Sequence, residues 1–218
     1  MKNSRAVYSL AMITILLLCT QALLAQNASN SLLARGEKIE SYVLCNGKKV
    51  KAIYKVRDRS NRKVMLGVNS YSTSAIDTTL KGKIEVPATI MAPNGLPYKV
   101  IAVSRRAFAD CRHIVEVVLP DSIYDIGDQS FMNCRSLRSI VLPVGTRYLW
   151  PYAFRGCNNL RRIEVKASVP PDSYNDVFDD HTLRFATLVV PAAHAKSYRN
   201  AFVWNMFRYS ISNWDLRR

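Results

Sequence analysis

The sequence has few of the features on which disulfide-rich proteins and membrane transporters depend. It contains only five cysteines in 218 residues, which is too few for a dense disulfide scaffold. It also lacks any run of about 18 or more apolar residues, which excludes a multi-span membrane protein. Acidic residues are scarce, since 16 Asp and Glu stand against 31 Lys and Arg and leave a formal net charge of +15. This excess of positive charge favours acidic partners.

Several motifs of catalysis and metal binding are missing as well. The chain has no Cys-x-x-Cys pair, no Gly-x-Ser-x-Gly elbow, no glycine-rich phosphate loop and no His-Glu-x-x-His motif. We therefore expect no catalytic residue, no metal and no cofactor. One acidic cluster could hold calcium, but it lacks the spacing of an EF-hand and is more simply a solvated loop. The cluster consists of Asp172, Asp176, Asp179 and Asp180.

The first 25 residues have the three-part layout of a secretory signal peptide. Lys2 and Arg5 precede an apolar stretch at 10–18, and small residues end at Ala25. We expect cleavage after Ala25 and export to the periplasm, the cell surface or the medium, with no membrane span left afterwards. A retained signal anchor and a lipoprotein signal at Cys19 are the competing interpretations. Export also argues against a nucleic-acid partner.

A repeat of 23 residues organises the centre of the chain. Aligning 104–126, 127–149 and 150–172 brings chemically similar residues into columns, and partial copies flank them at 84–87 and 178–191. Each unit is too small to bury its own apolar side, so neighbouring units are expected to stack and share one core. The columns are Phe108, Phe131 and Phe154; Cys111, Cys134 and Cys157; Ile114, Leu137 and Leu160; Val117, Ile140 and Ile163; and Leu119, Leu142 and Val165.

The spacing within each unit predicts a mostly β fold. Leu137-x-x-Ile140-x-Leu142 is typical of a leucine-rich repeat, in which a short strand points alternate residues inward. We expect a short solenoid of 23-residue coils with a parallel sheet on one face. The phenylalanines should form a core ladder and the cysteines buried thiols, with a disulfide to Cys45 as the alternative. The outward residues of the strands are the candidate ligand-binding surface: Glu116, Val118, Ser139, Val141, Arg162 and Glu164.

The repeated units resemble the BspA-like leucine-rich repeats of bacterial secreted and surface proteins. The resemblance covers about residues 84–191 and rests on Ser130-Phe131-x-x-Cys134-x-x-Leu137-x-x-Ile140-x-Leu142-Pro143 and its two relatives in the neighbouring units. It implies a non-enzymatic binding solenoid, in a family associated with adhesion to host or neighbouring-cell surfaces.

The segment Lys48–Lys63 concentrates basic residues in an alternating pattern. Val50, Ala52, Tyr54 and Val56 share one parity, which predicts a half-buried strand. Turn residues at 58–62 and alternation of Val64, Leu66 and Val68 predict a hairpin. Its basic face could bind sulfated or carboxylated glycans, other anionic polymers or nucleic acid, or it could protect an exposed edge from aggregation. The candidate polyanion-binding residues are Lys49, Lys51, Lys55, Arg57 and Arg59.

These observations predict a signal peptide at 1–25, a β-rich N-terminal cap at 26–100, three repeats at 101–172 and a partial repeat with a cap at 173–218. Ala195, Tyr198, Ala201 or Phe202, and Trp204 have helical spacing, which predicts a short helix over the last coil.

The function that we expect is recognition of an extracellular protein or anionic glycan, through the stacked sheet and the adjacent basic hairpin. One alternative is a structural envelope protein that is held electrostatically to anionic polymers. The other is a secreted hydrolase with its site in irregular loops.

Overall fold

The structure, a computed structural model, describes residues 32–174 and 176–212. The expected signal peptide at 1–25 lies outside the described residues. Within the described ranges, no helix is both long and apolar enough to cross a membrane.

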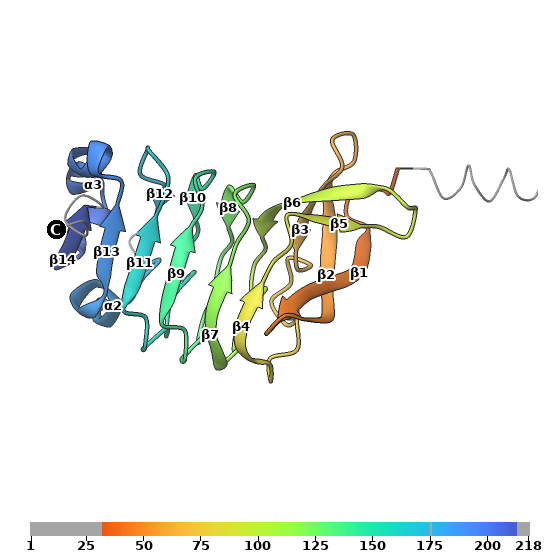
Figure 1. Ribbon diagram of the computed structural model, residues 1–218, viewed down its shortest axis with the longest axis horizontal. Helices are drawn as coiled ribbons and strands as arrows, with labels where there is room; N and C mark the ends of the chain where they lie inside the picture. The colour runs from red at the N-terminus through yellow and green to blue at the C-terminus, as the bar shows by residue number, and fades with distance from the viewer. Residues whose placement is uncertain (1–31, 175, 213–218) are drawn as a thin grey trace, which may run out of the picture.

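The chain winds into stacked coils that contribute strands to two faces (Figure 1). The main face consists of parallel strands β4 (Lys81–Glu85), β7 (His113–Val118), β9 (Ser139–Leu142), β11 (Arg162–Val165), β13 (Thr187–Val190) and β14 (Tyr209–Ser212). The short-strand face consists of parallel strands β6 (Pro97–Val103), β8 (Asp125–Ile126), β10 (Tyr148–Leu149) and β12 (Asp172–Ser173). β5 (Thr89–Met91) pairs antiparallel with β6.

Three antiparallel strands cap the N-terminal end and join the two faces. They are β1 (Lys38–Cys45), β2 (Lys48–Asp58) and β3 (Lys63–Leu66). β1 pairs with β4 of the main face and β3 pairs with β6 of the short-strand face, so all the strands belong to one 14-stranded sheet. The predicted mostly β solenoid with an N-terminal β cap is therefore confirmed.

The predicted hairpin is formed by β2 and β3, with two differences from the expectation. The return strand ends at Leu66, because Gly67 has a left-handed backbone with φ 94°, so Val68 lies beyond it. β2 pairs with β1 on one side and β3 on the other, so it is not a sheet edge. Its basic residues therefore do not protect an exposed edge. They cover the outside of the cap, which in a solenoid must be polar to prevent end-to-end stacking.

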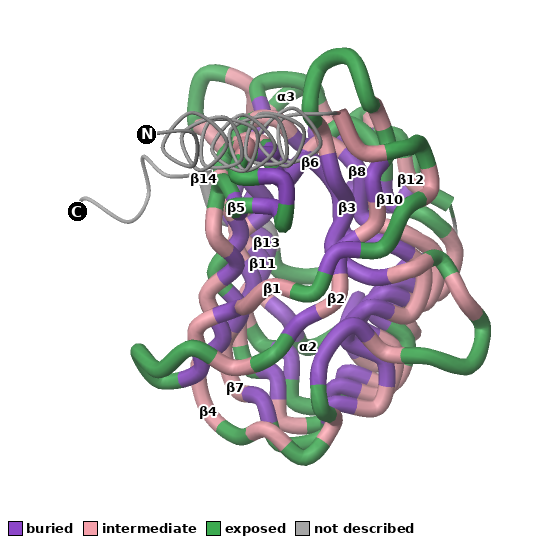
Figure 2. The backbone as a smooth tube through the Cα atoms, turned by 90° about the vertical axis from the view of Figure 1, so that its right-hand side faces the viewer, coloured by how far each residue is buried: buried purple, intermediate pink, exposed green. Residues whose placement is uncertain are grey.

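The phenylalanine column forms the predicted ladder in the core. Phe108 and Phe131 stack with ring centroids 4.9 Å apart, and Phe131 and Phe154 stack at 5.1 Å. Phe178 of the partial repeat extends the ladder, 5.3 Å from Phe154. The backbone that faces the inside of the coils is buried, as the view along the stack shows (Figure 2). The inward residues of the main face are buried as predicted, including Leu137, Ile140 and Leu142.

The turn that carries each phenylalanine contains two left-handed residues at the same phase of the repeat. One position is Arg106, Gln129 and Tyr152, with φ of 55°, 54° and 58°. The other is Asp110, Asn133 and Gly156, with φ of 63°, 60° and 75°. Asn, Asp and Gly tolerate this conformation best, which accounts for the second set.

The C-terminal end closes over the ladder largely as expected. The helix α3 (Ala195–Asn200) and the 3-10 turn η2 (Trp204–Met206) bury Tyr198 and Trp204. The Tyr198 hydroxyl donates to the Ala167 carbonyl at 2.7 Å, and Trp204 packs edge-on against Phe178 at 6.1 Å. α3 ends at Asn200, so Phe202 lies outside the helix and is exposed.

Part of the expected acidic loop is helical. Asp179 caps the helix α2 (Asp180–Phe185), where its Oδ1 accepts from the Thr182 backbone N–H at 2.9 Å. Its other oxygen, Oδ2, accepts from the Gly156 backbone N–H at 3.0 Å. Asp179 therefore has a structural role, as an N-cap that also ties the helix to the preceding coil.

Candidate binding surfaces

The six candidate residues of the main face lie on β7, β9 and β11. Glu116, Ser139 and Arg162 occupy neighbouring positions in the strand register, and Val141 neighbours Glu164. All six side chains are half-buried or exposed, whereas the residues between them are buried. The stacking of equivalent coils thus brings residues that are 23 positions apart in the sequence into rows on one surface.

Charges on the main face are mixed and paired. The Lys83 ammonium lies 3.1 Å from Glu85 and 3.8 Å from Glu116, and Arg162 donates to Glu164 at 3.2 Å. The hydrogen bond to Glu85 is the first cause of a raised pKa of Lys83. Because Lys83 and Arg162 each have an acidic neighbour, the positive charge of these two residues is largely balanced on this face.

The five basic hairpin residues divide into two groups. At the start of β2, Lys51 pairs with Glu40 at 2.9 Å and Lys49 lies 4.2 Å from the centre of the Tyr42 ring. At the other end, Arg57 and Arg59 line a hollow of about 580 Å³ together with Arg35 and Lys63. Lys55 lies between the groups and is half-buried.

The turn at the end of the hairpin is fixed by Asp58. Its carboxylate accepts from both the backbone N–H and the side-chain amide of Asn61, at 3.0 and 2.8 Å. These hydrogen bonds are the largest causes of its lowered pKa. The turn thereby holds Arg57 and Arg59 near β8 and so next to the short-strand face.

Our sequence reasoning missed an aromatic surface on the short-strand face. Tyr148 is the first residue of β10, Trp150 comes directly after this strand, and Tyr174 comes directly after β12. Trp150 and Tyr174 stack with centroids 5.8 Å apart. The sequence repeat did not align the two stacked rings. Tyr148 pairs with Asp172, so the step between these coils is 24 residues, whereas a uniform step of 23 aligns Trp150 with Ser173 and not with Tyr174.

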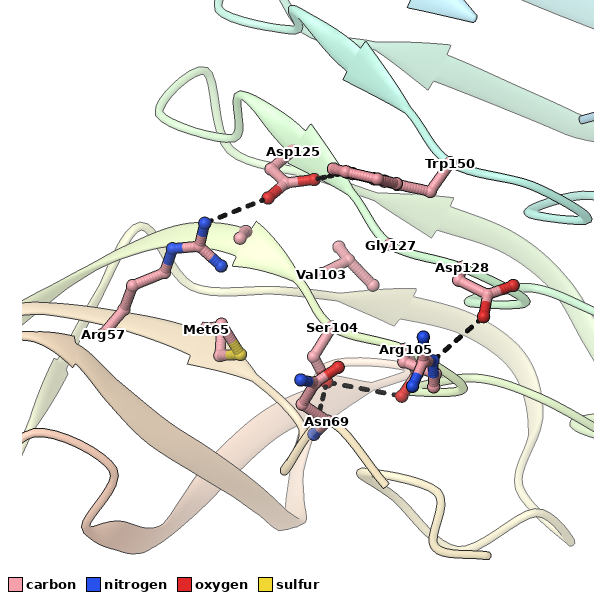
Figure 3. A pocket seen from close by; sticks show the side chains of 11 residues that line it. Arg57, Met65, Asn69, Val103, Ser104, Arg105, Asp125, Gly127, Asp128 and Trp150 are labelled. Carbon is pink, nitrogen blue, oxygen red and sulfur yellow. Dashed lines mark hydrogen bonds and ion pairs between the residues drawn. The ribbon is translucent and has the colours of Figure 1, made fainter. Parts of the chain in front are cut away.

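Arg57 and Asp125 connect this aromatic surface to the hairpin. Arg57 lies 3.6 Å from Asp125, whose other oxygen accepts from the Trp150 indole N–H at 2.6 Å (Figure 3). Burial raises the pKa of Asp125, and the Trp150 hydrogen bond and the Arg57 charge partly oppose it.

Cys45, Cys111, Cys134 and Cys157 are all free and buried, so the predicted buried thiols are confirmed and no disulfide joins Cys45 to the repeats. The Cys134 thiol donates to the Phe108 carbonyl, and the Cys157 thiol to the Phe131 carbonyl, each at 3.1 Å. Burial raises the pKa of Cys111 to about 12. These thiols fill the core and are poorly suited to nucleophilic chemistry.

The part of the chain that the structure describes contains no group of three or more His, Cys, Asp or Glu side chains that could hold a metal ion. The hollows on the short-strand face combine aromatic and charged side chains. The arrangement of both faces suits binding.

Comparison with known proteins places the repeat in a family. A family model described as a BspA type leucine-rich repeat region, with 6 copies, matches residues 94–206. Among solved structures, a leucine-rich repeat protein of T. pallidum covers 67% of this chain and 91% of its own, at 15% sequence identity and a TM-score of 0.32. No curated protein matches the chain. The family match spans more than half of the 218 residues. The chain belongs to the BspA-type leucine-rich repeat family.

Proposed function

We propose that this protein is an exported binding module without chemistry of its own, and that its main face recognises an extracellular protein. The observation that carries the proposal is the row of outward side chains that parallel stacking aligns across β7, β9 and β11. Extended surfaces of this kind are what solenoids offer to a partner.

The chemistry of the main face favours a protein as the ligand there. Val118 and Val141 supply apolar contact between charged residues of both signs. A polyanion would meet Glu85, Glu116 and Glu164 on this face, and their repulsion would oppose its binding. A protein surface can present complementary charges of both signs.

The test is an array of extracellular proteins and glycans probed with the full chain. We expect a protein ligand whose binding is weakened when Arg162→Glu reverses the charge at the centre of the main face. Arg135→Glu is the matched control, because it makes the same charge change at an exposed residue in the turn before β9. Equal binding by the two variants, or the lack of any protein ligand, would contradict the proposal.

Recognition of an anionic glycan by the basic hairpin is a second candidate function. It is favoured by the hollow that Arg35, Arg57, Arg59 and Lys63 line at the end of the hairpin. Salt distinguishes specific recognition from nonspecific attachment to anionic polymers. Nonspecific attachment depends only on charges that salt screens, so its affinity falls more steeply as the salt concentration rises.

A further inference from the structure

A second hollow, of about 420 Å³, lies on the short-strand face beside the basic one. It is lined by four aromatic side chains together with an arginine and an aspartate: Tyr124, Tyr148, Trp150, Tyr174, Arg57 and Asp125. Asp172 and Ser173 of β12 complete its polar rim. We call the surface of Tyr148, Trp150 and Tyr174 the aromatic shelf.

Two of the three rings of the aromatic shelf are placed by specific contacts. The hydrogen bond from the Trp150 indole to Asp125 fixes the plane of the indole, and Tyr174 lies against it at an interplanar angle of 23°. The Asp125 side chain is only 10% exposed, so it is firmly placed itself. A ligand that stacks on these rings would therefore not have to order them first.

Burial in the core does not account for the shelf. Leu149 and Ile126 are the residues of these strands that point inward, and both are fully buried. Tyr148, Trp150 and Tyr174 remain 46%, 40% and 50% exposed, on the outside of the coil. Three large aromatic side chains that stay in solvent on one surface are typical of a binding site.

Arg57 makes the shelf continuous with positive charge. It lines the aromatic hollow, the basic hollow and a third hollow of about 230 Å³ that Trp150 also lines. Its one ion pair among the described residues is the 3.6 Å contact with Asp125, which leaves most of its N–H donors for a ligand. The surface thus offers flat rings followed by a cluster of guanidinium and ammonium groups.

We propose that the aromatic shelf and Arg57 form a binding site for an acidic polysaccharide, in which sugar rings stack on Trp150 and Tyr174 and an anionic substituent accepts hydrogen bonds from Arg57. The C–H groups on the face of a pyranose carry partial positive charge and match the negative face of an aromatic ring. A carboxylate or sulfate matches the planar donor fork of arginine. Sugar hydroxyls match the polar rim.

This inference rests on the glycan part of the proposed function and deepens it, because it moves recognition from the hairpin to the neighbouring short-strand face. It is independent of protein binding by the main face. An apolar peptide is disfavoured because the rim of the hollow holds two carboxylates and an arginine. The same carboxylates, Asp125 and Asp172, require the anionic substituent to lie on the side of Arg57 that faces the basic hollow, while the sugar rings alone occupy the aromatic one. The bases of a single-stranded nucleic acid would also stack on such rings, so an oligothymidylate is the competing probe.

The experiment titrates the full chain with three hexasaccharides: oligogalacturonate for carboxylate, a heparin fragment for sulfate and cellohexaose as the neutral sugar. Binding is followed by calorimetry and, in a Trp214→Phe background, by protection of tryptophan fluorescence from acrylamide, since the two remaining tryptophans are the exposed Trp150 and the buried Trp204. We expect at least one acidic hexasaccharide to bind and to protect the fluorescence, more tightly than cellohexaose. The acidic probe that binds identifies the anionic group.

The variants Trp150→Ala and Tyr174→Ala should each weaken this binding about tenfold or more. Trp150→Phe should retain most of it, because it keeps a stacking ring. Phe202→Ala is the control, since it removes an exposed aromatic ring at the far end of the solenoid. Circular dichroism confirms that each variant is folded. Should Trp150→Ala unfold after losing its bond to Asp125, Tyr174→Ala carries the test.

Unchanged affinity in folded Tyr174→Ala would overturn the shelf as a binding site. If binding is instead lost when Lys49, Lys51, Lys55 and Arg59 are changed to Gln, the glycan function of the hairpin still stands. Equal affinity for cellohexaose would overturn the requirement for an acidic group. Tighter binding of an oligothymidylate than of any hexasaccharide would overturn the choice of a sugar. If no hexasaccharide binds at millimolar concentration and heparin does not retain the chain, both the inference and the glycan function fail.

Discussion

Phe131 is the residue whose loss should damage the fold most directly. It is fully buried and stacks against a phenylalanine on each side. We expect Phe131→Ala to lower the free energy of unfolding by about 3 to 5 kcal/mol, because it removes buried apolar area and leaves a cavity between two coils. Chemical denaturation measures the change. Phe202→Ala should cost within about 0.5 kcal/mol, since Phe202 is exposed. A similar small loss for Phe131→Ala would contradict the ladder as a source of stability.

Asp125 gives a prediction that depends on pH. A carboxyl whose pKa is raised by folding holds its proton more tightly in the folded chain than in the unfolded chain. It therefore contributes stability below its ordinary pKa of 3.8, and this contribution is lost as the pH rises through the raised value. Asp125→Asn keeps an oxygen for the Trp150 indole and removes the charge.

We therefore expect Asp125→Asn to be at least as stable as the parent chain at neutral pH, with the difference shrinking as the pH falls. Melting temperatures measured across the acid range test this. A variant that is clearly less stable than the parent chain at neutral pH would show that the attraction between Asp125 and Arg57 outweighs the cost of burying the carboxylate.

Residues that repeat at a constant step were predictable one by one. The inward positions, the phenylalanines and the thiols all follow from columns that the printed sequence shows directly. The stacked pair of Trp150 and Tyr174 was not predictable in the same way. The step between the two residues is 24, and the equivalent position of the preceding coil is Gly127, which is not aromatic. A pair of residues that occurs only once in the array forms no column, so the repeat that predicts the fold does not reveal it.

At the scale of elements, the hairpin concentrates positive charge on the outside of the cap. We expect a variant with Lys49, Lys51, Lys55, Arg57 and Arg59 all changed to Gln to stay folded and to elute from heparin at lower salt. Four of the five residues are exposed, and Lys55 is half-buried. Exposed substitutions cost within about 0.5 kcal/mol each, so the fold should tolerate the changes. Retention at the salt concentration of the parent chain would contradict a polyanion-binding role for the hairpin.

A matched variant separates local from total charge. Changing Arg112, Arg135, Arg138, Arg161 and Lys166 to Gln removes the same charge from exposed residues of the repeats. It should change heparin retention less than the hairpin variant does. Equal losses in the two variants would show that heparin responds to the net charge of the chain and not to the hairpin.

The elements themselves were predictable where local pattern decided them. Period-2 alternation gave β2, and helical spacing gave α3. α2 was missed because its six residues carry too little periodicity, and its position depends on Asp179 bonding to Gly156 in the preceding coil. The strands that flank the hairpin could not be predicted from the sequence either, because the pairing of β3 with β6 is a long-range contact that no local pattern encodes.

For the whole molecule, the position of the charge matters more than its total of +15. In about 0.1 M salt, charges more than about 10 Å apart are largely screened from one another. Arg57 and Arg59 line one hollow, so both would attract the same anionic group of a ligand, whereas cations on distant coils would not reinforce them. Recognition of a polyanion should therefore depend on this local cluster, and aromatic stacking on the neighbouring shelf should add a contribution that salt does not screen.

This difference predicts how binding responds to salt. Between roughly 50 and 200 mM salt, heparin retention that depends on charge alone should fall steeply. Tyr174→Ala should weaken binding of an acidic hexasaccharide by about the same factor at every salt concentration, because the variant loses the stacking contribution and keeps the electrostatic one. Calorimetry at several salt concentrations measures both affinities. Equal affinities of the parent chain and Tyr174→Ala at every salt concentration would mean that charge alone holds the ligand, which would favour nonspecific attachment to anionic polymers over recognition by the short-strand face.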